Sequence, residues 1–206
     1  QQNAIQGASY LQDIGDWYNK NVTGSMIIQG RMLRDIRLGS KNNPVIISIS
    51  SLTLSNCVSL QRLLLSNITT LSGTLNLTAC EHLQEIYADG TSLAQIVLPS
   101  GGGLRVVEYS RFNQYLSLSN YPLLTDDGIG IDLCKTVISD FFIVDCALVR
   151  PMKILVDIMN AQMEQGDNHA LKRIRAVGFE ESYNNSFILD KLVDLTNGTY
   201  SGLSSE

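Results

Sequence analysis

The 206-residue sequence is poor in the residues that build metal and redox sites. It has two histidines and four cysteines, with no C-x-x-C pair and no compact Cys/His cluster; they are His82, His169, Cys57, Cys80, Cys134 and Cys146. Zinc sites need such clusters, so we expect no metal and no cofactor. A chain of this length can form a core without disulfide staples, and we therefore expect buried, reduced cysteines.

Long apolar segments and an excess of positive charge are also missing. The longest apolar runs, such as residues 141–144, are too short to cross a bilayer, so we expect no membrane insertion. Charged residues make up 17% of the chain and the net charge is −5, which gives no basic surface for nucleic acid.

The two ends of the chain carry few structural signals. The N-terminus lacks the basic start and apolar stretch of a signal peptide. The C-terminus, NGTYSGLSSE, is rich in Gly, Ser and Thr, as linkers are. We expect the chain to be part of a longer polypeptide, with residues 199–206 as a linker.

A repeat runs through the middle of the sequence. Stretch 52–60, LTLSNCVSL, returns 23 residues later as LNLTACEHL at 75–83. Similar apolar triplets, each followed three residues later by a candidate inward residue, recur at longer and shorter steps: Leu52-x-Leu54 with Cys57, Leu75-x-Leu77 with Cys80, Ile96-x-Leu98 with Gly101, Leu116-x-Leu118 with Tyr121, Phe141-x-Ile143 with Cys146, and Ile174-x-Ala176 with Phe179. Apolar residues at i and i+2 predict a strand with one buried face, and a regular period predicts a solenoid.

This pattern resembles the leucine-rich repeat, L-x-x-L-x-L-x-x-N/C-x-L. The best match is ISDFFIVDCAL at 138–148, in which Ile138, Phe141, Ile143, Cys146 and Leu148 fill all five positions. The resemblance implies the α/β class and a leucine-rich repeat solenoid with a parallel sheet over residues 49–198. In this reading, Cys57, Cys80, Tyr121 and Cys146 are structural positions at the turn of each coil.

The return path of each coil is predicted to change along the chain. Apolar triplets at 63–65, 86–88 and 107–109 favour extended return paths in the first repeats. Stretches 151–166 and 186–198 have helical apolar spacing with Pro or Ser at the start and Gly at the end, so we expect helical return paths in the last repeats.

Two further helical signals lie outside that pattern. Stretch 123–135, LLTDDGIGIDLCK, resembles the L-T-D-x-G segment of cysteine-containing leucine-rich repeats, with Thr125 as a helix cap. Residues 1–48 fit the repeat poorly. We expect an amphipathic helix over 10–22 that caps the solenoid, followed by a strand of an incomplete first repeat over 32–38.

Candidate chemistry is sparse. Cys80 with His82, or Asp126 with Asp127, are the residues on which an enzyme or an enzyme-regulatory domain would depend. An acidic metal loop at 125–128 would need more oxygen ligands than TDDG supplies. A cysteine that recurs at one repeat phase is better explained by packing, so we expect no catalytic residue.

The outward positions of the main strands indicate a binding surface. They are small and polar in the early repeats and become aromatic and charged later, where Tyr115, Phe142, Arg173 and Arg175 are the predicted binding residues. We expect a non-catalytic module that binds a protein or glycan, or that acts as a structural spacer. Stretches 83–101 and 171–198 resemble leucine-rich regions of phage tail or virion proteins and of bacterial surface proteins, which implies a virion or a cell surface as the location.

Overall fold

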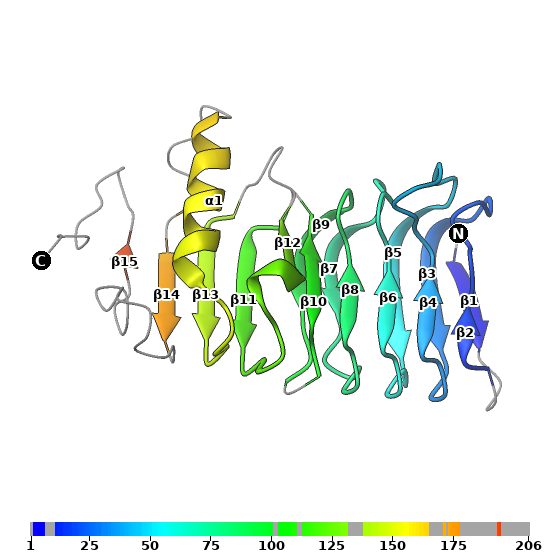
Figure 1. The fold of residues 1–206 in the computed structure, drawn as a ribbon. Coiled ribbons are helices and arrows are strands. Elements are labelled where there is room, and N and C mark those ends of the chain that lie inside the picture. Colours follow the sequence, from blue (N-terminus) through cyan, green and yellow to red (C-terminus); the bar gives the residue numbers. More distant parts are fainter. Residues whose placement is uncertain are drawn as a thin grey trace, which may run out of the picture.

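The chain winds into successive coils, and most coils contribute one strand to each of two faces. The computed structural model describes residues 2–6, 11–100, 103–110, 113–131, 138–164, 171, 173–177 and 193–194. Within them, all strand pairs are parallel except the last, which joins β14 to β15. The fold is a parallel β-solenoid (Figure 1).

One face, which we call the ribbon face, carries the first strand of each coil and the two strands at the C-terminal end. Its strands are β1 (Gln2–Gln6), β3 (Thr23–Gln29), β5 (Ser48–Ser55), β7 (Ser72–Asn76), β9 (Ser92–Val97), β11 (Tyr115–Ser119), β13 (Asp140–Val144), β14 (Arg173–Val177) and β15 (Val193–Asp194). They form three separate sheets, in the orders β1-β3-β5, β7-β9 and β11-β13-β14-β15.

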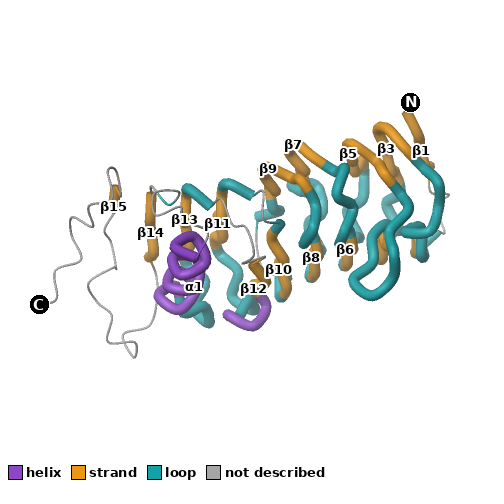
Figure 2. Tube along the Cα trace, turned by 90° about the horizontal axis from the view of Figure 1, so that it is seen from above, coloured by secondary structure: helices purple, strands orange, loops and turns teal. Residues whose placement is uncertain are grey.

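The other face, the return face, carries a single uninterrupted sheet. Its strands are β2 (Asp13–Ile14), β4 (Asp35–Arg37), β6 (Arg62–Leu64), β8 (Glu85–Tyr87), β10 (Val106–Tyr109) and β12 (Ile129–Ile131). They pair in the order in which they occur in the sequence. Figure 2 shows the two rows of strands with the connecting loops at their ends.

The core lies between the two faces and is filled by the inward residue of each strand. Across the return face, one buried residue per strand is aligned with the next by the register; these residues are Ile14, Ile36, Leu63, Ile86, Val107 and Ile129. Each such side chain stabilises the fold by about 1.5–3 kcal/mol relative to an exposed one. Because every coil buries its apolar face against its neighbours, the stack itself creates the core.

A repeated turn takes the chain off the ribbon face. Asn56, Asn120 and Asp145 adopt positive φ angles of 54°, 58° and 50°, a region that Asn and Asp tolerate better than most residues. Each directly precedes the inward residue of the turn, and the backbone N–H three residues further on donates to that residue's carbonyl, as from Leu60 to Cys57 at 3.1 Å. The sequence period therefore corresponds to a recurring backbone conformation.

A buried polar position also has a structural explanation. Asn113 stands where most repeats have an apolar residue, yet it is fully buried. Its side-chain amide donates to the Leu93 carbonyl at 3.2 Å, and its side-chain oxygen accepts from the Ser110 N–H at 2.8 Å. The amide links two coils, so its burial leaves both polar ends satisfied.

The predicted α/β class is wrong, because the described residues are nearly all strand and contain a single α-helix. That helix, α1 (Pro151–Glu164), lies where a helix was expected over 151–166. Helical return paths are not general, however. In the stretch 186–198, the described residues Val193 and Asp194 form β15 and pair antiparallel with β14.

The helix expected over 10–22 is also wrong. Asp13 and Ile14 form β2, which pairs with β4, and the Trp17 N–H donates to the Arg37 carbonyl at 3.0 Å. The spacing of the apolar residues in this stretch matches that of a helix. Return strands of two or three residues are too short to show the apolar–polar alternation that identifies a strand. Residues 23–38 make a complete coil in which the buried Gly30 takes the turn position.

Three smaller expectations have mixed outcomes. Leu148 is 55% exposed, and its neighbour Val149 is buried in its place. Thr125 precedes the 3-10 helix η1 (Asp126–Gly128), but its side chain makes no capping hydrogen bond. The predicted positions Gly101, Cys134 and Phe179 and the predicted linker 199–206 lie outside the described residues.

Candidate functional site

The three described cysteines occupy the turns and are buried, free thiols: Cys57, Cys80 and Cys146. The Cys57 Sγ donates to the backbone carbonyls of Ser55 at 3.4 Å and Ile28 at 3.6 Å, so it contacts the preceding coil. Burial raises the pKa of all three thiols, and that of Cys80 to about 12. A nucleophilic cysteine needs the opposite shift.

The two candidate catalytic pairs, Cys80 with His82 and Asp126 with Asp127, are not arranged for catalysis. Cys80 is buried, whereas His82 lies on the surface two residues further on. The buried Asp126 carboxylate accepts hydrogen bonds from both the backbone N–H and the guanidinium of Arg150, while Asp127 is exposed. Asp126 therefore joins η1 to the start of α1.

The four predicted binding residues lie on three adjacent strands of the ribbon face. The register aligns Tyr115 with Asp140 and Arg173 in one row, and Ser117 with Phe142 and Arg175 in the next. Neighbouring strands are about 4.8 Å apart, so each row is contiguous. Tyr115 and both arginines are exposed and Phe142 is half-buried. We call Tyr115, Phe142, Arg173 and Arg175 the ribbon patch.

An acidic residue of β13, Asp140, holds part of this patch in place. The Asp140 side chain is 5% exposed and forms an ion pair with the guanidinium of Arg173. Its other oxygen accepts from the Ser139 hydroxyl at 2.6 Å. This pairing fixes the direction of Arg173 while leaving more than half of its side chain accessible.

A pocket of about 300 Å³ lies beside the ribbon patch, where the ribbon-face sheet is interrupted between β9 and β11. Ser117 and Ser119 line one wall, and these residues are in register with Phe142 and Val144 of the patch strand β13. The Tyr121 hydroxyl donates to the Pro99 carbonyl at 2.6 Å and joins the two sides. No motif in the sequence predicts this pocket.

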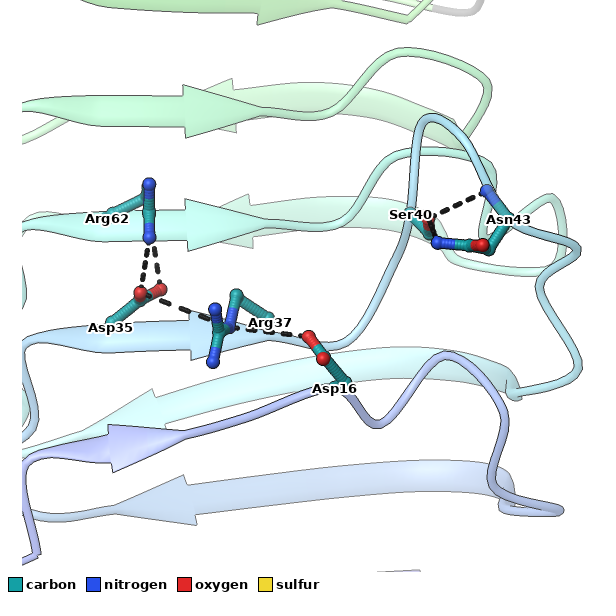
Figure 3. A network of polar contacts seen from close by, with 6 residues as sticks. All are labelled: Asp16, Asp35, Arg37, Ser40, Asn43 and Arg62. Atoms are coloured by element: carbon teal, nitrogen blue, oxygen red, sulfur yellow. Dashed lines mark hydrogen bonds and ion pairs between the residues drawn. The ribbon is translucent and has the colours of Figure 1, made fainter.

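A larger pocket of about 480 Å³ opens on the return face, and sequence reasoning missed it entirely. It lies over β4, β6 and β8 and is bounded by the loop that follows β4. Figure 3 shows its charged rim, in which Arg62 pairs with Asp35 and Arg37 lies between Asp35 and Asp16. The signal in the sequence is that Asp35 and Arg37 alternate with Ile36 and Leu38, and that Arg62 occupies the position of Asp35 in the next coil.

Within the part of the chain that the structure describes, no three His, Cys, Asp or Glu side chains cluster so that they could hold a metal ion. No helix there has the length and hydropathy needed to span a bilayer.

Comparison with models of known protein families, with curated proteins and with solved structures finds no match to this chain. An inference about function therefore depends on the fold, the ribbon patch and the two pockets described above.

Proposed function

We propose that this chain is a non-catalytic leucine-rich repeat module that binds a protein partner through the ribbon patch. The observation that carries the proposal is the register of β11, β13 and β14, which aligns two aromatic and two arginine side chains on one surface. Aromatic residues and Arg supply most of the binding energy in protein interfaces. The pocket between β9 and β11 adds a recess for an anchoring side chain of the partner.

The leucine-rich repeat type is supported by the position of the cysteines and leucines. Cys57, Cys80 and Cys146 each follow an apolar triplet and are buried where the chain leaves the ribbon face. A glycan is the alternative ligand of the same patch. A second alternative is that the chain acts as a structural spacer within a longer virion or cell-surface protein and binds no ligand. The location follows from the sequence resemblance alone.

The experiment compares three forms of the whole chain, immobilised and exposed to protein extracts of the source organism. The forms are the wild type, the patch variant Phe142→Ala/Arg175→Ala, and the control Thr53→Ala/Ser55→Ala on β5. We expect the wild type and the control to retain the same protein. The patch variant should bind that protein at least about 10-fold more weakly, which is a loss of about 1.4 kcal/mol of binding free energy. Equal retention by all three forms would show that the ribbon patch is not the binding surface.

A thiol-labelling experiment separates this proposal from the enzyme alternative. The buried thiols of Cys57, Cys80 and Cys146, with their raised pKa values, should react slowly in the native protein and rapidly after unfolding. A rapid reaction of native Cys80 near neutral pH would contradict the non-catalytic assignment and favour Cys80 with His82 as chemistry.

A further inference from the structure

The interruption of the ribbon-face sheet leaves β11 without a neighbouring strand on one side. The Gln114 N–H donates to the Ala94 carbonyl at 3.0 Å, so the two coils are paired just before β11 begins. β9 and β11 then belong to separate sheets, and no backbone hydrogen bond joins the described residues 95–98 to the described residues 115–119. On the side that faces β9, β11 is therefore an edge strand.

The backbone of this edge points into the pocket between β9 and β11. On the opposite side, the Asn120 N–H donates to the Val144 carbonyl of β13 at 3.0 Å. Backbone groups of successive strand residues point to opposite neighbours, so those of Ser117 and Ser119 point away from β13 and towards β9. Both serines are exposed and line the pocket. Their N–H and C=O groups are the ones that a further strand would pair with.

Tyr121 spans the far end of the pocket. It occupies the turn position that a buried cysteine fills in three other coils. The Cys57 Sγ lies 3.6 Å from the Ile28 carbonyl of the preceding coil, whereas the hydroxyl at the end of the Tyr121 ring donates to the Pro99 carbonyl at 2.6 Å. The longer side chain bridges a wider space between coils than a cysteine does, which is consistent with the missing ladder between β9 and β11.

The walls of the pocket are uncharged. Polar groups and apolar surface alternate in it; the lining residues include Gln95, Ile96, Val97, Leu98, Ser100, Ser117, Ser119 and Asn120. Burial raises the pKa of Tyr121 to about 12, so its hydroxyl stays protonated. A charged side chain would lose its water here without gaining an ionic partner. A peptide backbone is neutral, and it both donates and accepts hydrogen bonds as the strand edge requires.

We propose that an extended segment of the protein partner pairs with β11 in this pocket and adds a strand to the sheet of β11, β13, β14 and β15. The backbone of the segment hydrogen-bonds to Ser117 and Ser119, and its apolar side chains pack on the half-buried Val97 and Leu98. The same sheet carries the ribbon patch, so one partner contacts both. The inference rests on the proposed function in assigning the segment to that partner.

The test selects binders to the immobilised full chain from a display library of random peptides of about seven residues, long enough to span the five residues of β11. Each selected peptide is synthesised with free backbone N–H groups and in two N-methylated forms, one for each set of alternate residues. At least one N-methylated form should bind the wild type at least about 10-fold more weakly, because methylation removes the N–H donors that pair with the strand edge.

A matched pair of variants locates the binding. Ser119→Trp fills the pocket, and Ser55→Trp makes the same change at the equivalent exposed position, the last residue of β5. Both variants should keep the melting temperature of the wild type. We expect Ser119→Trp to weaken binding of the selected peptides at least about 10-fold and Ser55→Trp to leave it unchanged.

Three outcomes would overturn the proposal. These are a library that yields no binder, peptides that bind Ser119→Trp as tightly as the wild type, and binding that neither N-methylated form weakens. The last result would show that the chain recognises side chains rather than an extended backbone.

Retention of a protein from the extract separates this proposal from the ribbon patch. Ser119→Trp and Phe142→Ala/Arg175→Ala should both reduce it. Full retention by Ser119→Trp together with a loss in the patch variant would reject strand addition and leave the ribbon patch in place. The reverse result would reject the ribbon patch and leave strand addition in place.

Discussion

The two faces of the solenoid are built on the same inward pattern and differ in what they turn outward. On the return face, charges pair between coils: Arg62 pairs with Asp35 of the preceding coil at 2.6 Å, and Lys41 reaches past two strands to Glu108. On the ribbon face, the first coils present small polar residues, and aromatic and arginine side chains gather only at β11, β13 and β14. The inward residues therefore determine the coil, and the outward residues are free to differ between faces.

The largest expected effect contrasts two adjacent residues of β13. Phe141 is fully buried and Phe142 belongs to the ribbon patch. Phe141→Ala should reduce the free energy of unfolding by about 3–5 kcal/mol, because it leaves a cavity between the faces. Phe142→Ala should reduce it by no more than about 1 kcal/mol. Urea unfolding of both variants measures the difference, and similar losses would mean that Phe142 is core rather than surface.

An intermediate effect is the pH dependence of the free energy of unfolding that comes from Cys80, at a turn between the two faces. Burial raises the pKa of Cys80 to about 12 from an ordinary value of 9.0. Above pH 9, the unfolded chain loses this proton before the folded chain does, so the free energy of unfolding falls as pH rises towards 12. The slope for one such thiol is at most about 1.4 kcal/mol per pH unit.

Urea unfolding between pH 8 and pH 11, with reducing agent present, measures this effect. Cys80→Ala should flatten the curve in part, because the pKa values of Cys57 and Tyr121 are also raised by burial and contribute to the same slope. A stability curve for the wild type that stays flat over this range would contradict the burial of ionisable groups at the turns.

The smallest effect belongs to the paired charges of the return face. Arg62 is 45% exposed in its pair with Asp35, so Arg62→Met should change the free energy of unfolding by only about 0–1 kcal/mol. Asp126→Asn weakens a buried carboxylate that accepts two hydrogen bonds from Arg150. It should reduce the free energy of unfolding by about 1–3 kcal/mol. Thermal unfolding in low and high salt compares the two. If Arg62→Met cost more, the return face would depend on its surface charges for stability.

Much of the solenoid could be predicted from the leucine period, because inward positions in a stack must be apolar in every coil. The strands at 63–65, 86–88 and 107–109 are the observed β6, β8 and β10. Before residue 48, the strand expected over 32–38 is observed as β4 (Asp35–Arg37). The rest of these coils was missed, since Gly30 rather than a cysteine fills the turn after β3 and β2 has only two residues. A second signal, Asn or Asp immediately before the turn residue, marks Cys57, Tyr121 and Cys146 alike.

The surfaces were predictable to different degrees for a physical reason. The ribbon patch follows from equivalent positions in successive repeats, and the register places those positions side by side. The return-face pocket depends on Ser40 and Lys41 in a loop that one of the described coils contains, and on contacts that reach from that loop to Glu108. A period cannot predict contacts that occur once.

The interruption of the ribbon-face sheet between β9 and β11 has a mechanical consequence. The return-face sheet continues through the same level from β10 to β12, so the two sides of the solenoid resist stretching unequally. At this level, tension along the axis would be carried by the β10–β12 pairing on one side and, on the other, by a few cross-links such as the Asn113 amide and the Tyr121 hydroxyl. The pocket beside the ribbon patch lies at that interruption, so its width depends on those few cross-links rather than on a continuous sheet.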